Sequence, residues 1–403
     1  MWTIRNVFGL SLTWAPALRH DSPMSRVPAT IVPVSLPAPK SSLQYDLFTT
    51  FLGNAADLSN TIELWDCVPR YAYGARRQSD HRASGAQPQV YQHTFKWQPQ
   101  PKAHNPPLTC DLTITPARVL TDAGWIDVFP SADEELVEEV LRKLFADQQY
   151  GLHDPQAGRS YVRFSLHTIR RELAARGKTR SIPQIKQALD ILNKATVKVT
   201  AHDASGKARP LCQGPIIPHL FSRGEVANPD TTLWAAQLHP LITSAIEKLT
   251  YRQFNYKVLM SLASPLARWL LKRLSHDYLN ASLVDPYHVL MSSIARDSGL
   301  LQHSRTSANI KTLEAALEEL VTRGILLTYT AEKRCQGRAI TDVKYALMPS
   351  SAFVVETKAA NARENNSDAR LSATSLPGPW HERHATRQRK LGPVRRHTGA
   401  AGR

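Results

Sequence analysis

Two stretches of this 403-residue chain carry basic and amide side chains at a spacing suited to DNA binding. In each stretch, apolar residues recur at helical spacing after a Ser or Thr, which leaves polar side chains on the opposite side. Gln and Asn pair with adenine, whereas Arg and Lys bind guanine or phosphate oxygens. The side chains predicted to contact DNA are Arg180, Gln184, Lys186, Gln187 and Lys194 in the first stretch and Arg305, Asn309, Lys311 and Thr312 in the second. Taken singly, each is more typical of a solvated amphipathic helix, so the interpretation depends on the group.

The first stretch belongs to residues 162–221, whose pattern predicts a helix-turn-helix followed by a β-hairpin. Ser165 is expected to cap the first helix. Ser181 and Gln184 have the spacing of a capping box, which satisfies free N–H groups where the second helix begins. Asn193 is also expected on the outward face of that second helix.

Residues 291–348 repeat this architecture. Ser292 is the expected cap of the first helix, and Thr306 or Ser307 that of the second. Gly324 is expected to end the second helix, because glycine readily adopts the left-handed conformation at a helix C-terminus.

Two β-rich runs around a basic turn follow each pair of helices and predict a hairpin wing. The expected strands are residues 195–202, 210–221, 325–330 and 340–348. The cations expected at the turns are Lys207 and Arg209 in residues 203–209 and Lys333, Arg334 and Arg338 in residues 331–338. A winged helix places one helix in a DNA groove and a basic loop on phosphate, so two wings in one basic chain indicate a protein that binds a long DNA site.

The surrounding sequence suggests how these segments are supported. Residues 111–120 alternate as a half-buried strand does, and the folded part is expected to begin near Leu112. Ser131 and Glu134 form a further capping box at the start of an amphipathic helix. Between the two winged segments lies an aromatic cluster that fits either a base-stacking platform or a core between domains, and we favour the core. Its members are Tyr251, Phe254, Tyr256 and Leu259.

These patterns predict an α+β, mainly helical fold with two tandem winged-helix domains. Residues 1–110 are expected to be a proline-rich, partly disordered extension, although residues 45–73 contain enough Phe, Leu and Trp to pack on something. The winged-helix domains are expected at residues 111–250 and 251–356. Residues 357–403 are expected to be a disordered basic tail, because they are polar, lack periodicity and carry 10 Lys and Arg against 3 Asp and Glu.

The composition limits the classes of partner and compartment. The net charge of +16 favours a polyanionic partner, a property that ribosomal and membrane-surface proteins share. The four cysteines form no CxxC pair and no His cluster has metal-ligand spacing, so we expect no metal site and a reducing cytoplasm. No apolar run is long enough to span a membrane. The N-terminus reads either as a poor signal peptide or as an early start that precedes the true one at Met24.

The sequence also lacks the motifs of the enzymes that commonly act on DNA. It has no GxxxxGK[ST] phosphate loop, and its only close histidines, His381 and His384, do not form an HxH pair. No Ser-His-Asp or Cys-His grouping can be recognised. We therefore expect no enzymatic activity and no cofactor.

Three segments resemble bacterial plasmid replication initiators of the theta-replication type. They are LTITPARVLTDAGWIDVFPSADEELVEEVLRKL, GRSYVRFSLHTIRREL and FNYKVLMSLASPLARWLLKRLSHDYL, and the resemblance covers residues 112–348. It implies that two winged-helix domains bind direct repeats at a plasmid origin. It further implies opening of an A+T-rich region, recruitment of the host initiator and helicase, and repression of the initiator's own promoter by dimers joined through the first domain.

Two other classes remain open from the residues alone. One is a winged-helix transcriptional regulator, and the other is a plasmid partition or DNA-bridging protein. Tandem repeats of about 15–20 base pairs next to an A+T-rich stretch near the gene would favour the initiator, because two domains span one to two helical turns.

Overall fold

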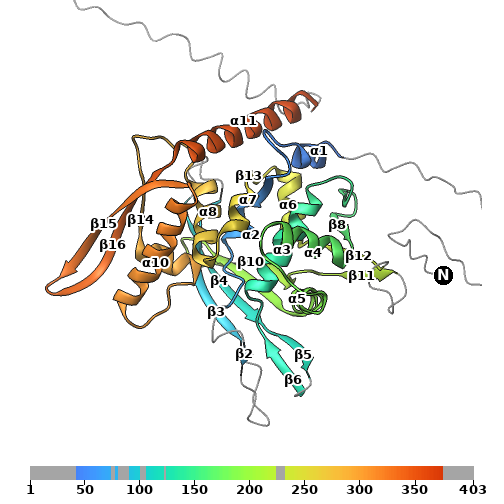
Figure 1. Ribbon diagram of the computed structural model, residues 1–403, viewed down its shortest axis with the longest axis horizontal. Helices are drawn as coiled ribbons and strands as arrows, with labels where there is room; N and C mark the ends of the chain where they lie inside the picture. Colours follow the sequence, from blue (N-terminus) through green and yellow to red (C-terminus); the bar gives the residue numbers. More distant parts are fainter. Residues whose placement is uncertain are drawn as a thin grey trace, which may run out of the picture. The chain divides into compact units, whose positions relative to one another are not determined.

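The computed structural model describes residues 42–73, 78–79, 90–99, 106–121, 124–223 and 232–374 (Figure 1). The expectations for the N-terminus, including Met24, and for residues 375–403 lie outside the described residues. Strands are as prominent as helices, since the described residues contain eleven helices and sixteen strands. The expectation of a mainly helical fold was therefore wrong, because several segments that had no assignment in the sequence pair into sheets.

Three helices and a hairpin form what we call the first unit. Their bounds are α3 (Ala132–Phe145), α4 (Leu166–Ala175), α5 (Ile182–Lys194), β9 (Thr196–His202) and β10 (Ala208–Pro215). The predicted capping residues are confirmed. The Oγ of Ser165 accepts the N–H of Thr168 at 3.1 Å, and both bonds of the Ser181 capping box are present. The Ser131 capping box is likewise complete at the start of α3.

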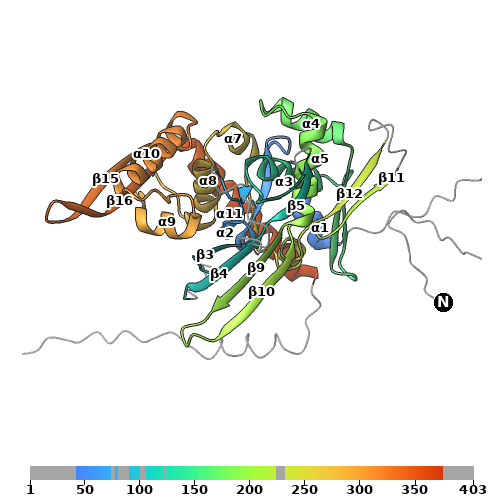
Figure 2. The same cartoon turned by 90° about the horizontal axis from the view of Figure 1, so that it is seen from below.

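The β9–β10 hairpin belongs to a larger sheet with the order β10-β9-β4-β3 (Figure 2). Its other strands are β3 (Tyr91–Trp97) and β4 (Leu108–Thr115), so β4 crosses the boundary expected at residue 110. The second wing strand was expected to reach residue 221, but β10 ends at Pro215. The chain turns at the buried Ile216 and Ile217, and residues 220–221 begin β11 in another sheet.

Two further sheets flank the first unit. One has the order β11-β12-β8-β7, with the strands β7 (Gly151–Asp154), β8 (Arg159–Phe164), β11 (Leu220–Arg223) and β12 (Leu233–Gln237). The other has the order β2-β6-β5, with the strands β2 (Gln78–Ser79), β5 (Ala117–Thr121) and β6 (Gly124–Val128). Val119 and Val128 of the second sheet pack with Ile191 of α5, so the β5–β6 hairpin lies against that helix.

The second unit repeats the order of helices and hairpin. It comprises α8 (Pro265–Asp277), β14 (Tyr287–Leu290), α9 (Met291–Ser298), α10 (Thr306–Thr322), β15 (Leu326–Gln336) and β16 (Ala339–Pro349). The three strands pair in the order β14-β16-β15.

The expected caps of the second unit were wrong. Leu290 is the N-cap of α9, and the hydroxyl of Ser292 instead donates to Asp342 of β16 at 2.6 Å. Arg305 is the N-cap of α10, with no side-chain cap hydrogen bond, so neither Thr306 nor Ser307 caps it. For Ser292, the contact with Asp342 outweighs the local capping preference.

The hairpin of the second unit is longer and tighter than expected. Residues 331–338 were expected to form a loop, but Lys333 and Arg334 lie on β15, opposite Val343 and Asp342. Only Gly337 and Arg338 remain in the turn, where Gly337 adopts a φ of 62°. A two-residue turn with positive φ matches the twist of a hairpin, and this explains why the polar run continues the strands.

Residues 42–73 are integral to the fold, so the folded part begins well before Leu112. They form α1 (Leu43–Thr49), β1 (Leu58–Ile62) and α2 (Glu63–Cys67). The segment that follows β12 contains α6 (Pro240–Lys248), β13 (Tyr251–Asn255) and α7 (Tyr256–Ser261). Strand β1 pairs antiparallel with β13. The segment that connects the two units therefore contains a strand, β13, that pairs with β1 of the N-terminal segment.

The helix α11 (Ser351–Thr374) follows the second unit (Figure 1). It overturns the expectation of a disordered tail for residues 357–374. The guanidinium of Arg363 donates to Asn60 Oδ1 at 2.6 Å and to the backbone carbonyls of Leu47 and Phe48 at 2.9 and 2.8 Å. These bonds hold α11 against α1 and β1, a contact that local sequence does not show.

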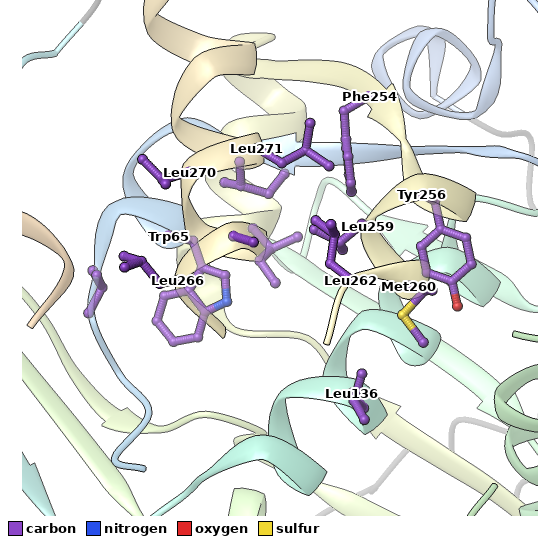
Figure 3. Close-up of a cluster of buried hydrophobic side chains, with 14 of the residues drawn as sticks. Trp65, Leu136, Phe254, Tyr256, Leu259, Met260, Leu262, Leu266, Leu270 and Leu271 are labelled. Carbon is purple, nitrogen blue, oxygen red and sulfur yellow. The ribbon is translucent and has the colours of Figure 1, made fainter. Parts of the chain in front are cut away.

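The aromatic cluster between the units is core, as we expected. Tyr251, Phe254, Tyr256 and Leu259 are all buried. Figure 3 shows Tyr256 and Leu259 among other buried side chains from α2, α3, α7 and α8. Within the described ranges, no helix is both long enough and apolar enough to cross a membrane.

Candidate nucleic-acid interface

The start of α10 carries the cations that sequence reasoning assigned to a DNA groove. Arg305 and Lys311 are exposed, and Arg305 lies at the helix N-terminus, where backbone N–H groups also favour anions. Asn309 is engaged instead: its amide donates to the carbonyl of His303 and its Oδ1 accepts the N–H of the same residue, both at 3.0 Å. The hydroxyl of Thr312 donates to the carbonyl of Ala308 at 3.0 Å.

The β15–β16 hairpin adds three exposed cations, Lys333, Arg334 and Arg338. Successive strand residues point to opposite faces. Lys333 is opposite the fully buried Val343, so it lies on the face that packs on the helices of the unit. Arg334 is opposite Asp342 on the other face. Lys333 is therefore better placed than Arg334 to act together with α10.

On the first unit, several predicted DNA contacts are engaged within the protein. Arg180 forms an ion pair with Asp133 of α3, with its Nε at 2.8 Å and its Nη2 at 2.7 Å from Oδ1. The Oε1 of Gln184 accepts the N–H of Ser181 at 2.8 Å as part of the capping box. Lys194 pairs with Asp190 at 2.7 Å.

Four predicted residues of the first unit remain as its candidate contact surface. They are Lys186 and Gln187 on α5 and Lys207 and Arg209 on the β9–β10 hairpin, all of which are exposed. Asn193 is not among them, because its amide donates to the carbonyl of Ile217 at 2.8 Å.

Sequence reasoning missed the β5–β6 hairpin beside α5. Its outward face carries Arg118, Leu120 and Trp125, and Leu120 and Trp125 are 63% and 56% exposed. The guanidinium carbon of Arg118 lies 5.9 Å from the centre of the Trp125 ring. The alternation of residues 111–120 indicated a strand, but nothing local indicated that it would pack on α5.

A second missed feature is a buried ion cluster where α2, α3 and α8 meet. Its members are four carboxylates, Asp66, Glu135, Glu138 and Glu139, and four cations, Arg70, Arg142, Arg268 and Lys272, all of them buried. Since α3 belongs to the first unit and α8 to the second, the cluster joins the two. In the sequence, Glu134 of this helix was assigned a role in the capping box, but no local pattern indicated that Glu135, Glu138 and Glu139 would be buried.

Asp66 lies at the centre of the ion cluster. Both guanidinium NH₂ groups of Arg142 donate to it at 2.6 Å, and the ammonium of Lys272 donates to its Oδ1 at 2.9 Å. Two bonds run directly between the units. Arg268 of α8 donates to Glu135 of α3 at 2.5 Å, and Lys272 donates to Glu139.

The cations keep three of the buried carboxylates, Asp66, Glu135 and Glu138, ionised. Burial alone would raise each pKa, because it penalises the charged form. Arg142 and Lys272 nevertheless hold the pKa of Asp66 well below its usual range. In the same way, Arg268 lowers the pKa of Glu135 and Arg70 lowers that of Glu138.

A further contact joins the sheet of the first unit to α9 of the second. The backbone N–H of Lys96 on β3 donates to Asp297 Oδ1 at 3.0 Å, and a ring nitrogen of His93 lies 2.5 Å from the carbonyl oxygen of Arg296. Asp297 is buried and also pairs with Arg296. The two units thus meet at two separate places.

Comparison with known proteins finds no matching family model and no matching curated protein. The chain is similar to crystal structures of domains 2 and 3 of RctB. One gives a TM-score of 0.40 at 10% identity over 73% of this chain and 99% of the other, and a selenomethionine derivative gives 0.40 at 10% over 64% and 91%. It is also similar to the Pi initiator protein in complex with iteron DNA, with a TM-score of 0.37 at 12% identity over 54% of this chain and 91% of the other.

Proposed function

We propose that this protein is a replication initiator of the plasmid type that binds repeated sites in double-stranded origin DNA. The observation that carries the proposal is the repetition within one chain of a helix-turn-helix and an antiparallel hairpin, each with exposed cations on the second helix and on the hairpin. The proposal assigns both units to the winged-helix class.

Each unit contributes contacts of two kinds. Arg305 and Lys311 on α10, and Lys186 and Gln187 on α5, approach base edges in the major groove. Lys333 and Arg338 on one hairpin, and Lys207 and Arg209 on the other, bind phosphate and set the position on the duplex. Arg180, Gln184, Lys194, Asn309 and Thr312 contact DNA only where they exchange their present hydrogen-bond or ion-pair partners for DNA. Arg334 lies on the other face of its strand and contacts DNA only where the duplex reaches that face.

The work of such a protein is positional and needs no covalent chemistry, cofactor or metal. Occupied repeats strain neighbouring DNA, and A+T-rich segments with pyrimidine–purine steps are the cheapest to deform. Host initiator and helicase then complete the unwinding. The proposal also includes repression of the protein's own promoter by a homodimer, which is supported by the sequence resemblance alone.

The test is a footprint on the DNA that flanks the gene, combined with single-strand probing of supercoiled plasmid. We expect protection of tandem repeats, probe sensitivity in an adjacent A+T-rich region and no nick in either strand. Affinity should fall by roughly 10³-fold between 50 and 200 mM salt, because several phosphate contacts release counterions. Protection of a single promoter site without any opening would support a transcriptional regulator instead, and a nicked or protein-linked strand would support a nicking initiator.

A further inference from the structure

We propose that the ion cluster around Asp66 is a positioning device, which holds the two units at one separation and rotation and so selects the spacing between the half-sites that each unit binds. This inference rests on the proposed function, since it concerns how the two DNA-binding surfaces of that function are arranged.

The chemistry of the cluster fits positioning better than it fits stability. Burying charges is costly, and an apolar interface of the same volume is often at least as stable. Ionic hydrogen bonds, however, are short and directional, so they accept only one arrangement of their partners. Asp66 receives donors from both sides, Arg142 from the first unit and Lys272 from the second, which fixes both helices relative to one residue.

The cluster is also balanced and almost completely paired. Its four carboxylates face four cations, and Glu138 receives the indole N–H of Trp65 at 2.6 Å besides the Nε of Arg70 at 3.0 Å. Any rotation of α8 against α3 would break the bonds of Arg268 and Lys272 together and leave buried charges unpaired. Such a penalty makes intermediate arrangements unfavourable.

The segment that connects the two units gives them little freedom to move relative to each other. Strand β13 is paired with β1 along its whole length, and α7 and α8 are separated only by residues 262–264. The contact between Lys96 and Asp297 restrains the same pair of units at a second place. Two restraints at separate points oppose rotation as well as separation.

A fixed arrangement has a measurable consequence on DNA. Two base pairs inserted between half-sites move one of them by about 7 Å and rotate it by about 70°. If the two units could move relative to each other, both could still contact their half-sites after the insertion. If their arrangement is fixed, one of the two units loses its contacts with DNA.

The experiment measures the affinity of the full chain for its footprinted repeat and for the same repeat with two inserted base pairs. Wild type should bind the inserted repeat about 30-fold more weakly, because the base contacts of one unit, which discriminate by about this factor, are lost. The double variant D66N/K272M removes one negative and one positive charge and so keeps the net charge. It should bind the natural repeat more weakly than wild type does, but its affinity should fall only about threefold when the two base pairs are inserted. A second charge-neutral pair, R268M/E135Q, removes a different bond between α3 and α8 and should relax the spacing in the same direction.

The matched control is R176M/E172Q, because Arg176 and Glu172 form an ion pair at the C-terminal end of α4 at 3.2 Å, inside the first unit. This variant should keep the 30-fold penalty of wild type. The inference is overturned if folded variants of the cluster keep the full penalty, if the control relaxes equally, or if wild type itself tolerates the insertion. Failure of wild type to distinguish the repeat from shuffled DNA would instead overturn the proposed function.

Discussion

At the scale of single residues, the structure separates side chains that are available to DNA from those already engaged. Arg305 and Lys311 are exposed on α10. Asn309, by contrast, forms two hydrogen bonds with the backbone of His303, and Arg180 forms an ion pair with Asp133. The sequence alone could not make this distinction, because polar residues on a solvated face look the same whether or not a partner stands beside them.

Arg305→Ala should relax sequence preference and cost about 1–3 kcal/mol of binding free energy, because it removes a contact with a base edge. Lys333→Ala should weaken binding to all sequences alike, because phosphate contacts carry no base information. The measurement is affinity for the natural repeat and for repeats mutated one base pair at a time. Identical profiles for the two variants would show that the division between base and phosphate contacts is wrong.

Asn309→Ala should lower the free energy of unfolding by about 1–2 kcal/mol in the absence of DNA, because two hydrogen bonds to His303 are lost. Thermal or urea unfolding of the free protein checks this. Lys311→Ala, two residues away and exposed, is the control and should leave stability unchanged. An Asn309 variant as stable as wild type that has lost sequence preference would favour the groove-reading role instead.

At the scale of elements, the decisive contacts run between segments far apart in sequence. Helix α11 is held to the N-terminal segment by Arg363, which is buried without a carboxylate beside it in the contacts described. Burial lowers the pKa of Arg363 to about 10, but the group remains charged at neutral pH. Its charge is therefore stabilised by Asn60 and by the carbonyls at the end of α1.

Arg363→Ala should therefore destabilise the protein by about 3 kcal/mol, because it removes three hydrogen bonds from a charged donor. Urea unfolding monitored by tryptophan fluorescence measures this loss. Lys358→Ala, an exposed change on the same helix, should have little effect. Equal stability of the two variants would show that α11 is not anchored through Arg363.

Local elements could be predicted from the sequence and distant ones could not. Ser131, Ser165 and Ser181 were identified as caps because a cap involves neighbours within four residues. Pairing of β1 with β13 joins residues almost 200 positions apart and leaves no local pattern. For the same reason the burial of the α3 carboxylates was not predicted, and residues 357–374, which have a weak helical periodicity, were taken for a tail.

At the scale of the whole molecule, the ion cluster links folding to pH. The folded-state pKa values of Asp66, Glu135 and Glu138 are lowered by their cationic partners. A lowered pKa contributes stability above the pKa of the unfolded chain, about 4 for these groups, and this contribution is lost as the pH falls through the folded-state values.

We expect the free energy of unfolding to change little between pH 7 and 5 and to fall steeply below about pH 4. Urea unfolding at a series of pH values measures this. The D66N/K272M variant should show a shallower fall, because the amide that replaces the Asp66 carboxylate takes up no proton in this range. A wild-type profile that stays flat down to about pH 3 would contradict the assignment of ionised carboxylates to the cluster.

The pairing of β1 with β13 and the hydrogen bonds from Arg363 to α1 have a consequence for biosynthesis. Residues 42–62 leave the ribosome long before their partners at 251–255 and at Arg363 have been made. The β1–β13 pairing therefore cannot form before residue 255 has been made, and the contacts with α1 cannot form before Arg363 has been made. Contacts of such long sequence separation also slow folding. A nascent chain halted before α11 is therefore expected to be an easy target for proteases and chaperones, which would couple the supply of competent protein to completion of its translation.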